Sequence, residues 1–193
     1  MAKPLLILAS QSPRRRDILS MTQLPFETLA VETAESLDPA ASVEENVTRL
    51  AYEKAVAASV LIESREPRHT IILAADTVVA KGRQMLGKPV GFDEAFAMLK
   101  SLQNRTHRVS TGFVLLSRRK NHTECVTTSV EFEPMSDGEI ERYLHAQKPY
   151  DKAGSYGIQD PLMACHVRRL EGCYYNVVGL PLSAVCKALK GFL

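Results

Sequence analysis

The sequence predicts a mixed α/β fold, organised as a single domain over residues 1–193. Short apolar runs typical of buried strands alternate with stretches of helical periodicity, which indicates helices packed on a sheet. Neighbouring strands joined by short polar turns interrupt that alternation. We therefore expect a mixed sheet with hairpins, and not a doubly wound parallel sheet.

The N-terminal third contains two predicted strands and two predicted helices. Leu5–Ala9 is a short continuous apolar run, as expected of a buried strand. After a polar turn, a helix is predicted from Pro13 to about Met21, because proline is favoured in the first helical turn. Phe26–Val31 is predicted to be the second strand. Ser42 and Glu45 have capping-box spacing, so a long helix is predicted from there to about Glu63.

The middle of the chain combines strands with one helix. Thr70–Val79 is predicted to be a strand, and the turn at Lys81–Gly82 leads to a second, short strand. The apolar residues of Asp93–Leu102 recur at helical spacing and predict a helix. Arg108–Leu116 and Thr123–Glu133 are predicted to be neighbouring antiparallel strands.

The C-terminal third begins with a helix from Ser136 to about Ala146, again with capping-box spacing. Gly154 and Gly157 indicate an irregular segment. Leu162–Leu170 is predicted to be a strand, and Leu182–Leu189 the last helix, begun by a proline.

Composition excludes several classes of function. The net charge of +2 is too small to predict a nucleic-acid or anionic-membrane surface. The apolar run Leu5–Ala9 is too short for a signal peptide or a membrane span. The four cysteines form no CxxC pair, so we expect reduced, mostly buried thiols and a cytoplasmic location. One disulfide in a secreted protein is the alternative.

The turn after the first strand has the residues of an anion site. Ser10, Ser12, Arg14 and Arg15 lie between a buried strand and a helix N-terminus. That N-terminus carries unpaired N–H groups and partial positive charge, and arginine binds phosphate oxygens bidentately. The alternative is that Ser12 only caps the helix and the arginines are solvated.

Asp76 lies inside an otherwise apolar strand. Burying a carboxylate is costly unless it is paired, hydrogen-bonded or bound to a metal. Its position predicts a metal ligand or general base at a cleft. A structural aspartate at a bulge or strand end is an equal alternative.

Two lysines give weaker indications of a phosphate site. Lys88 follows Gly87 at P-loop spacing from Gly82, but Pro89 stands where a P-loop needs Ser or Thr, so we reject that motif. Lys88 can still reach a phosphate, or be a surface turn residue. Lys54 alone has the pattern of a surface lysine whose stem packs beside an apolar helical stripe.

Seven blocks, in order over nearly the whole chain, resemble the Maf family of nucleotide pyrophosphatases. The blocks are Ser10-x-Ser12-Pro13-Arg14-Arg15, Arg49-Leu50-Ala51 with Glu53-Lys54-Ala55, Ala75-Asp76-Thr77, Gly87-Lys88-Pro89, Thr111-Gly112, Lys152-Ala153-Gly154 with Tyr156-Gly157-Ile158-Gln159, and Val178-Gly179-Leu180-Pro181.

The resemblance implies a Maf/ITPase-like fold with two lobes around a deep cleft, often dimeric. It implies Mg²⁺- or Mn²⁺-dependent cleavage between the α and β phosphates of a nucleoside triphosphate. Asp76 matches the catalytic acidic residue. Glu35 matches an acidic residue near the metal, although Ala34 departs from the usual Asp-Glu pattern. The implied phosphate-binding residues are Ser10, Ser12, Arg14, Arg15, Lys54 and Lys88.

Substrate choice within the family is implied by Arg14, Thr77 and Gln159, which resemble the branch acting on dTTP and UTP. CTP and modified pyrimidine nucleotides are further candidate substrates of this branch. The alternative branch prefers 7-methyl-GTP. Three further possibilities are a nucleotide-binding module without catalysis, a regulator of cell division, and an interaction protein whose dimer surface is its function. The expected partner is a nucleoside triphosphate, with no nucleic acid and no membrane, and with a homodimer possible.

Overall fold

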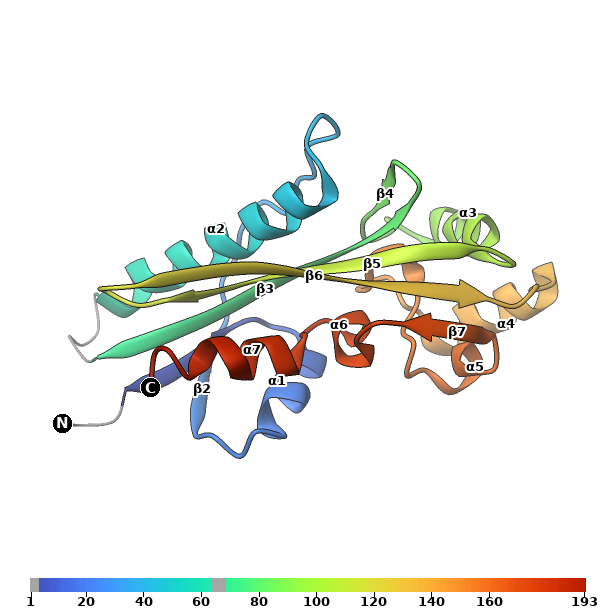
Figure 1. The fold of residues 1–193 in the computed structure, drawn as a ribbon. Helices are drawn as coiled ribbons and strands as arrows, with labels where there is room; N and C mark the ends of the chain where they lie inside the picture. The colour runs from blue at the N-terminus through green and yellow to red at the C-terminus, as the bar shows by residue number, and fades with distance from the viewer. Residues whose placement is uncertain (1–3, 64–68) are drawn as a thin grey trace.

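A long mixed β-sheet runs through the whole molecule (Figure 1). The computed structural model describes residues 4–63 and 69–193. In this part of the chain the strand order is β2-β1-β3-β5-β6-β7, and β4 pairs with β3. β1 is parallel to β2 and β3, and the remaining pairs are antiparallel. The strands are β1 (Leu5–Ala9), β2 (Phe26–Leu29), β3 (Thr70–Lys81), β4 (Gln84–Leu86), β5 (Thr106–Leu116), β6 (Asn121–Phe132) and β7 (Val167–Glu171).

The helices divide into two groups along this sheet, as Figure 1 shows. At one end α2 covers one face, while α1 and α7 cover the other. At the opposite end lie α3, α4 and α5. The helices are α1 (Pro13–Ser20), α2 (Val43–Glu63), α3 (Phe92–Leu102), α4 (Asp137–Gln147), the 3₁₀ turn η1 (Ala153–Ser155), α5 (Pro161–Ala164), α6 (Tyr174–Val178) and α7 (Leu182–Leu189).

Three apolar clusters fill these layers and define two lobes. One cluster joins β1, α1 and α7 to the sheet, and a second lies between α2 and the opposite face. The third, around Phe132, Leu99 and Leu144, fills the other end of the molecule. The predicted α/β fold with a mixed sheet, hairpins and two lobes is therefore confirmed.

One edge of β3 is left open between its partners. β5 pairs with β3 over residues 72–80, which occupies one edge. The opposite edge pairs with β1 up to Leu73 and with β4 from Val79 onward. Residues 74–78 therefore have no strand partner on that edge within the described residues. A strand edge without a neighbour leaves room for a ligand, and this gap contains Asp76 and Thr77.

Successive residues of β3 face opposite layers, as strand geometry requires. Ile71 and Leu73 belong to the cluster with α1 and α7, whereas Ile72 and Ala74 belong to the cluster under α2. By the same alternation Asp76 faces α2 and Thr77 faces α1. The open edge of β3 can thus be reached from helices on both sides of the sheet.

α2 lies unusually close to the sheet at Gly112, which pairs with Asp76. A Cβ added to Gly112 would stand 2.5 Å from the carbonyl carbon of Val47 and 2.7 Å from the backbone nitrogen of Thr48. No side chain can occupy that space, so the glycine permits direct contact between the α2 and β5 backbones. This contact sets the distance of α2 from the strand that carries Asp76.

Most predicted elements are confirmed, but one strand prediction is wrong. Leu162–Leu170 was expected to be a single strand; instead Pro161 begins the short helix α5, and β7 begins only at Val167. A short apolar run fits one buried helical turn as well as a strand, and proline in the first turn favours the helix. The sequence also gave no indication of α6.

Both predicted capping boxes form. Ser42 accepts from the N–H of Glu45 and Glu45 accepts from the N–H of Ser42, and Ser136 and Glu139 do the same at α4. Within the described residues no helix is long and apolar enough to cross a membrane. All four cysteines are free, but the expectation that they are mostly buried is wrong, since three are half-buried and Cys165 is exposed.

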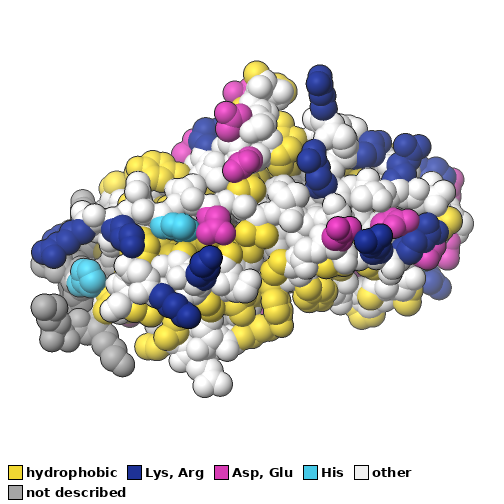
Figure 2. Space-filling model, viewed as in Figure 1, with side chains coloured by type: hydrophobic (Ala, Val, Ile, Leu, Met, Phe, Trp, Pro, Cys, Tyr) yellow, Lys and Arg dark blue, Asp and Glu magenta, His cyan; other side chains and the backbone are white. Residues whose placement is uncertain are grey.

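Charges are evenly mixed on the face shown in Figure 2, where Lys and Arg side chains lie among Asp and Glu side chains. Arg168 on β7, for example, binds Glu131 at 2.9 Å and Glu133 at 2.6 Å. This mixing agrees with the small net charge.

We expect Gly112→Ala to lower the free energy of unfolding by about 2 kcal/mol, because the added methyl must push α2 away from β5. Gly138→Ala is the matched control, since its Cβ would meet nothing within 4 Å. That control should be neutral or slightly stabilising. Urea unfolding measures both. Equal stability of the two variants would contradict the close packing of α2.

Candidate active site

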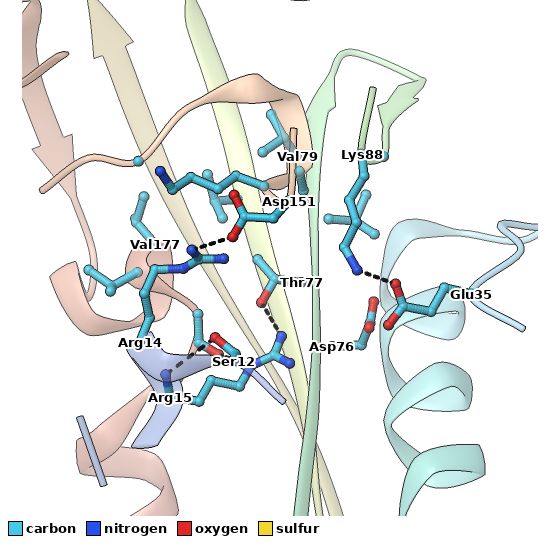
Figure 3. Close-up of a pocket in the computed structure, with 18 of the residues that line it drawn as sticks. Ser12, Arg14, Arg15, Glu35, Asp76, Thr77, Val79, Lys88, Asp151 and Val177 are labelled. Atoms are coloured by element: carbon cyan, nitrogen blue, oxygen red, sulfur yellow. Dashed lines mark hydrogen bonds and ion pairs between the residues drawn. The ribbon is translucent and has the colours of Figure 1, made fainter. Parts of the chain in front are cut away.

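A cleft of about 450 Å³ opens at the unpaired edge of β3, between the two lobes. Figure 3 shows residues of α1, β3 and the segments after β4 and α4 in its wall, to which α2 adds Leu50 and Lys54. A neighbouring hollow of about 560 Å³ shares Arg14, Arg15, Glu35, Lys54 and Lys88 with it. The two hollows therefore form one site with a common charged centre.

Asp76 and Lys54 form a buried ion pair at that centre. The Lys54 Nζ lies 2.5 Å from Asp76 Oδ1, and the two side chains are 8% and 10% exposed. Lys54 comes from α2, the helix that Asp76 faces. Because each buried charge would be costly alone, the lysine is what permits a carboxylate inside this apolar strand. The interpretation of Lys54 as a surface residue is therefore wrong.

Glu35 extends the pair into a charged cluster. Its Oε1 lies 2.5 Å from Lys54 Nζ, and its Oε2 lies 2.5 Å from Lys88 Nζ. Burial alone would raise the pKa of Glu35, but the hydrogen bonds from Lys54 and Lys88 outweigh burial and lower the pKa to about 2. The loop before α2 and the segment after β4 are thus joined through one carboxylate.

Arg15 is anchored by neutral acceptors on the opposite side of β3. Its Nε donates to the Gly179 carbonyl at 2.8 Å, and its Nη2 donates to Thr77 Oγ1 at 3.2 Å. Thr111 donates to the Asn176 carbonyl at 3.0 Å, so Thr77 must donate to Thr111 across their 2.9 Å contact. The Thr77 hydroxyl therefore accepts from Arg15 and donates to Thr111, and these bonds hold the Arg15 guanidinium in one orientation.

Burial lowers the pKa of Arg15, and nearby Asp76 opposes that shift. Arginine stays protonated in proteins even so. The side chain therefore places a fixed positive charge beside the central carboxylates.

Arg14 and the two serines surround the N-terminus of α1. Arg14 Nη1 lies 2.7 Å from Asp151 Oδ2, which links α1 to the segment after α4. Ser12 caps α1 by accepting from the Arg15 N–H at 3.4 Å, as predicted. Ser10 Oγ accepts from the Ser12 N–H at 3.1 Å. Ser10 lines only the neighbouring hollow, whereas Ser12 and Arg14 line both.

The other end of the cleft is mainly apolar. Its wall includes Val79, Val109, Tyr156, Val177 and Val178. Gln159 also lines the cleft and is exposed, and its side-chain amide makes no hydrogen bond to any described residue. An apolar slot with a free amide is suited to a planar heterocycle, while the charged centre is suited to phosphate.

The segment carrying Gln159 is fixed against β3 by its glycines. Gly154 has a φ of +67°, and an added Cβ would lie 2.9 Å from a Val79 methyl carbon. Its N–H donates to the Gly87 carbonyl at 3.0 Å. The irregular segment predicted from Gly154 and Gly157 thus belongs to the cleft and joins the segment that carries Lys88.

The predicted site residues come together from six separate parts of the sequence. All line the cleft or its neighbouring hollow: Ser10, Ser12, Arg14, Arg15, Glu35, Lys54, Asp76, Thr77, Lys88 and Gln159. Sequence reasoning missed the roles of Asp151, Lys152 and Thr111. Lys152 and Thr111 lie in the recognised blocks, but no local spacing shows their partners, which are distant in sequence.

Glu35 and Asp76 are the two carboxylates that share the Lys54 ammonium at this centre, and they could offer oxygens to a metal. Within residues 4–63 and 69–193 no group of three or more His, Cys, Asp or Glu side chains could hold an ion. The two accepting oxygens each lie 2.5 Å from one ammonium nitrogen, so they are no more than twice that distance apart. Two carboxylates are a donor set typical of Mg²⁺, which otherwise takes water and phosphate oxygens.

The chain is similar to a known protein family and to several named proteins. The family model described as "Maf-like protein" matches residues 5–192. A protein of Pelodictyon phaeoclathratiforme named dTTP/UTP pyrophosphatase is 72% identical over 100% of both chains. Proteins of the same name from Chlorobium chlorochromatii and Bacillus velezensis are 58% and 42% identical, covering 97% of this chain and 95% and 96% of theirs.

We expect Glu35→Gln to lower the free energy of unfolding at pH 7 by about 1 kcal/mol, a value discounted because the side chain is 36% exposed. The pKa of Glu35 falls from 4.5 to about 2 on folding, so its stabilisation is present above pH 4.5 and is lost as the pH falls toward 2. Urea unfolding in EDTA should show the free energies of unfolding of the variant and wild type converging as the pH falls from 4.5 toward 2. Glu27→Gln, at an exposed glutamate of β2, should show no such convergence.

Proposed function

The chain belongs to the Maf family, and we propose that it is a nucleoside triphosphate pyrophosphatase that hydrolyses dTTP and UTP to the monophosphate and pyrophosphate. The observation that carries this proposal is the buried Lys54–Asp76 pair beside a cluster of phosphate-binding cations, in a chain whose full-length relatives share that activity in their name. Such an enzyme is a hydrolase acting on acid anhydrides.

The charged end of the cleft binds the triphosphate in this proposal. Arg14, Arg15, Lys54 and Lys88 supply positive charge, and the α1 N-terminus with Ser10 and Ser12 adds hydrogen-bond donors. Without substrate, Lys54 and Lys88 form ion pairs with the carboxylates of Glu35 and Asp76. Phosphate oxygens compete for the same ammonium groups, so substrate binding changes the partners of these lysines. Cations that neutralise charge building on the leaving pyrophosphate lower the barrier.

Asp76 is the proposed general base. Its carboxylate accepts a proton from water, the water oxygen bonds to the α-phosphorus, and the bond from that phosphorus to the bridging oxygen breaks. Pyrophosphate leaves with the electron pair. Asp76 is suited to this step because it faces the cleft from a rigid strand and is aligned by Lys54.

Glu35 and Asp76 would hold a divalent cation, Mg²⁺ or Mn²⁺. Such an ion neutralises phosphate charge and lowers the pKa of a bound water. Lys54 and Lys88, which now neutralise these two carboxylates, would then be available to the phosphates.

The apolar end binds the base, and Gln159 selects it. Thr77 is engaged by Arg15 and Thr111, and Arg14 is engaged by Asp151, so both act on selection by shaping the site. Gln159 keeps a free amide, which can pair with the donor and acceptor of a uracil or thymine edge. The shared name of the relatives favours this branch over the one acting on 7-methyl-GTP. No observation favours a cell-division regulator or a binding module without catalysis.

Four further properties stay predictions. A cytoplasmic location is supported by four free cysteines. A single domain over residues 1–193 is supported by the sheet that runs through both lobes. A homodimer and the absence of nucleic-acid or membrane partners rest on resemblance and on the small net charge.

We expect Asp76→Asn to fold and to lose about 10²- to 10⁴-fold in kcat with UTP, because general-base catalysis contributes that much. Asp137→Asn makes the same chemical change at an exposed carboxylate of α4 and should keep wild-type kcat. Pyrophosphate release measures both. Near-normal turnover by a folded Asp76→Asn variant would contradict the role of this carboxylate.

A panel of nucleotides tests the activity itself. Pyrophosphate release in Mg²⁺ or Mn²⁺ should be faster with dTTP and UTP than with ATP, GTP or 7-methyl-GTP, and EDTA should abolish it. The reason is that an apolar slot with one amide matches a pyrimidine edge. Preference for 7-methyl-GTP would move the chain to the other branch, and no release from any nucleotide would refute the proposed activity.

A further inference from the structure

The hydroxyl of Tyr143 binds the chain on both sides of Gln159, through the side chain of Asp160 and the backbone of Gly157. Tyr143 lies on α4 and is only 2% exposed. Its hydroxyl donates to Asp160 Oδ2 at 2.7 Å and accepts from the Gly157 N–H at 3.0 Å. These two partners bracket Gln159 in the sequence. One buried hydroxyl therefore closes a short loop around the residue that faces the base end of the cleft.

Two further contacts tighten this loop. Lys152 Nζ donates to the same Asp160 Oδ2 at 2.9 Å, and both side chains are nearly buried. The Asp160 N–H donates to the Gly157 carbonyl at 3.0 Å. A Cβ on Gly157 would lie 2.7 Å from the Asp160 carboxylate, so glycine is required for this approach. The ammonium of Lys152 is thus committed to the loop, although Lys152 lines the cleft.

The amide of Gln159 needs such support if it is to choose between pyrimidines. Uracil presents an N3–H donor and an O4 acceptor, whereas cytosine presents an N3 acceptor and an N4 donor. A glutamine amide can match either pattern by turning over, since one side accepts and the other donates. Selection therefore requires that the position of Gln159 be restricted. No described residue hydrogen-bonds its side chain, so the restraint that the structure shows acts on the loop that carries Gln159.

We infer that Tyr143 is a positioning residue for base selection, which acts through Asp160 and Gly157 on Gln159 and favours uracil or thymine nucleotides over cytosine nucleotides. This inference rests on the proposed function and adds to it a residue that does not touch the substrate. The tyrosine belongs to the apolar cluster of the second lobe, so α4 contributes to specificity from behind the cleft wall.

Binding of the non-hydrolysable α,β-methylene analogues of UTP and CTP tests the inference without requiring turnover. The ratio of their two Kd values should favour the UTP analogue in wild type and fall by about tenfold in Tyr143→Phe, the loss expected for one ordered hydrogen-bonding arrangement. Tyr150→Phe is the matched control, because Tyr150 packs on the same cluster and its hydroxyl binds no described residue. A merely structural loss lowers the folded fraction and weakens both analogues equally, which leaves the ratio unchanged.

A double-mutant cycle with Gln159→Ala tests whether Tyr143 acts on base selection through Gln159. If Tyr143 acts through Gln159, Tyr143→Phe changes the ratio no further in the Gln159→Ala background. Three outcomes would each overturn the inference. Tyr143→Phe could change the Kd ratio fully in the Gln159→Ala background, folded Tyr143→Phe could leave the ratio unchanged, or wild type could bind both analogues equally. Should Tyr143→Phe fail to fold, Asp160→Asn keeps an acceptor for Tyr143 but removes the charge that binds Lys152, and should lower the ratio by about threefold.

The binding assay also separates this inference from the proposed function. A wild type that binds the UTP analogue selectively but releases no pyrophosphate from UTP would refute the activity, while a fall of the ratio in Tyr143→Phe would still support the positioning role. Normal hydrolysis with an unaltered ratio would refute the positioning role alone.

Discussion

The buried ion pair between Asp76 and Lys54 is the constraint on which the rest of the site depends. A carboxylate in the middle of an apolar strand is costly unless it has a partner, and here Lys54 on α2, which lies very close to the sheet, is that partner. α2 does so because Gly112 lets its backbone touch β5. The same carboxylate faces an edge of β3 that β1 and β4 leave open. Stability and access to the cleft are therefore set by the same short stretch of strand.

Most of the cationic side chains in the cleft are already paired with carboxylates, and this pairing affects ligand binding. Lys54, Lys88, Arg14 and Lys152 each rest on a carboxylate, while Arg15 is held by neutral acceptors. A site with so many paired charges is stable without substrate, and its cations are already oriented. In the proposed function, a triphosphate that binds there must exchange partners with these carboxylates. The free energy of binding is thus a difference between two sets of ion pairs, which makes recognition sensitive to the charge and length of the phosphate chain.

Local features could be predicted from the sequence, whereas distant contacts could not. Capping boxes, prolines in first turns and apolar runs act over a few residues, and they gave the correct bounds for Leu5–Ala9 and Leu182–Leu189. The strand over Leu162–Leu170 was wrong because a buried helical turn and a buried strand have the same apolar composition. The role of Lys54 was missed on spacing alone because its partner is 22 residues away. Resemblance to a family indicated residues that the structure places along the cleft, but not the hydrogen bonds that orient Arg15.

The two ends of the cleft are built from different interactions, and this difference separates chemistry from selection. Ion pairs form the phosphate end, so a change there alters charge and the reaction itself. Apolar side chains and a loop closed by neutral and charged hydrogen bonds form the base end, where Tyr143 lies behind the wall. The loop is anchored to α4 in one lobe and Lys54, the partner of Asp76, lies on α2 in the other. If the proposed roles hold, base selection can therefore change without disturbing Asp76. One continuous sheet fixes the positions of the two ends of the cleft relative to each other. Substitutions can nevertheless change the residues of either end separately.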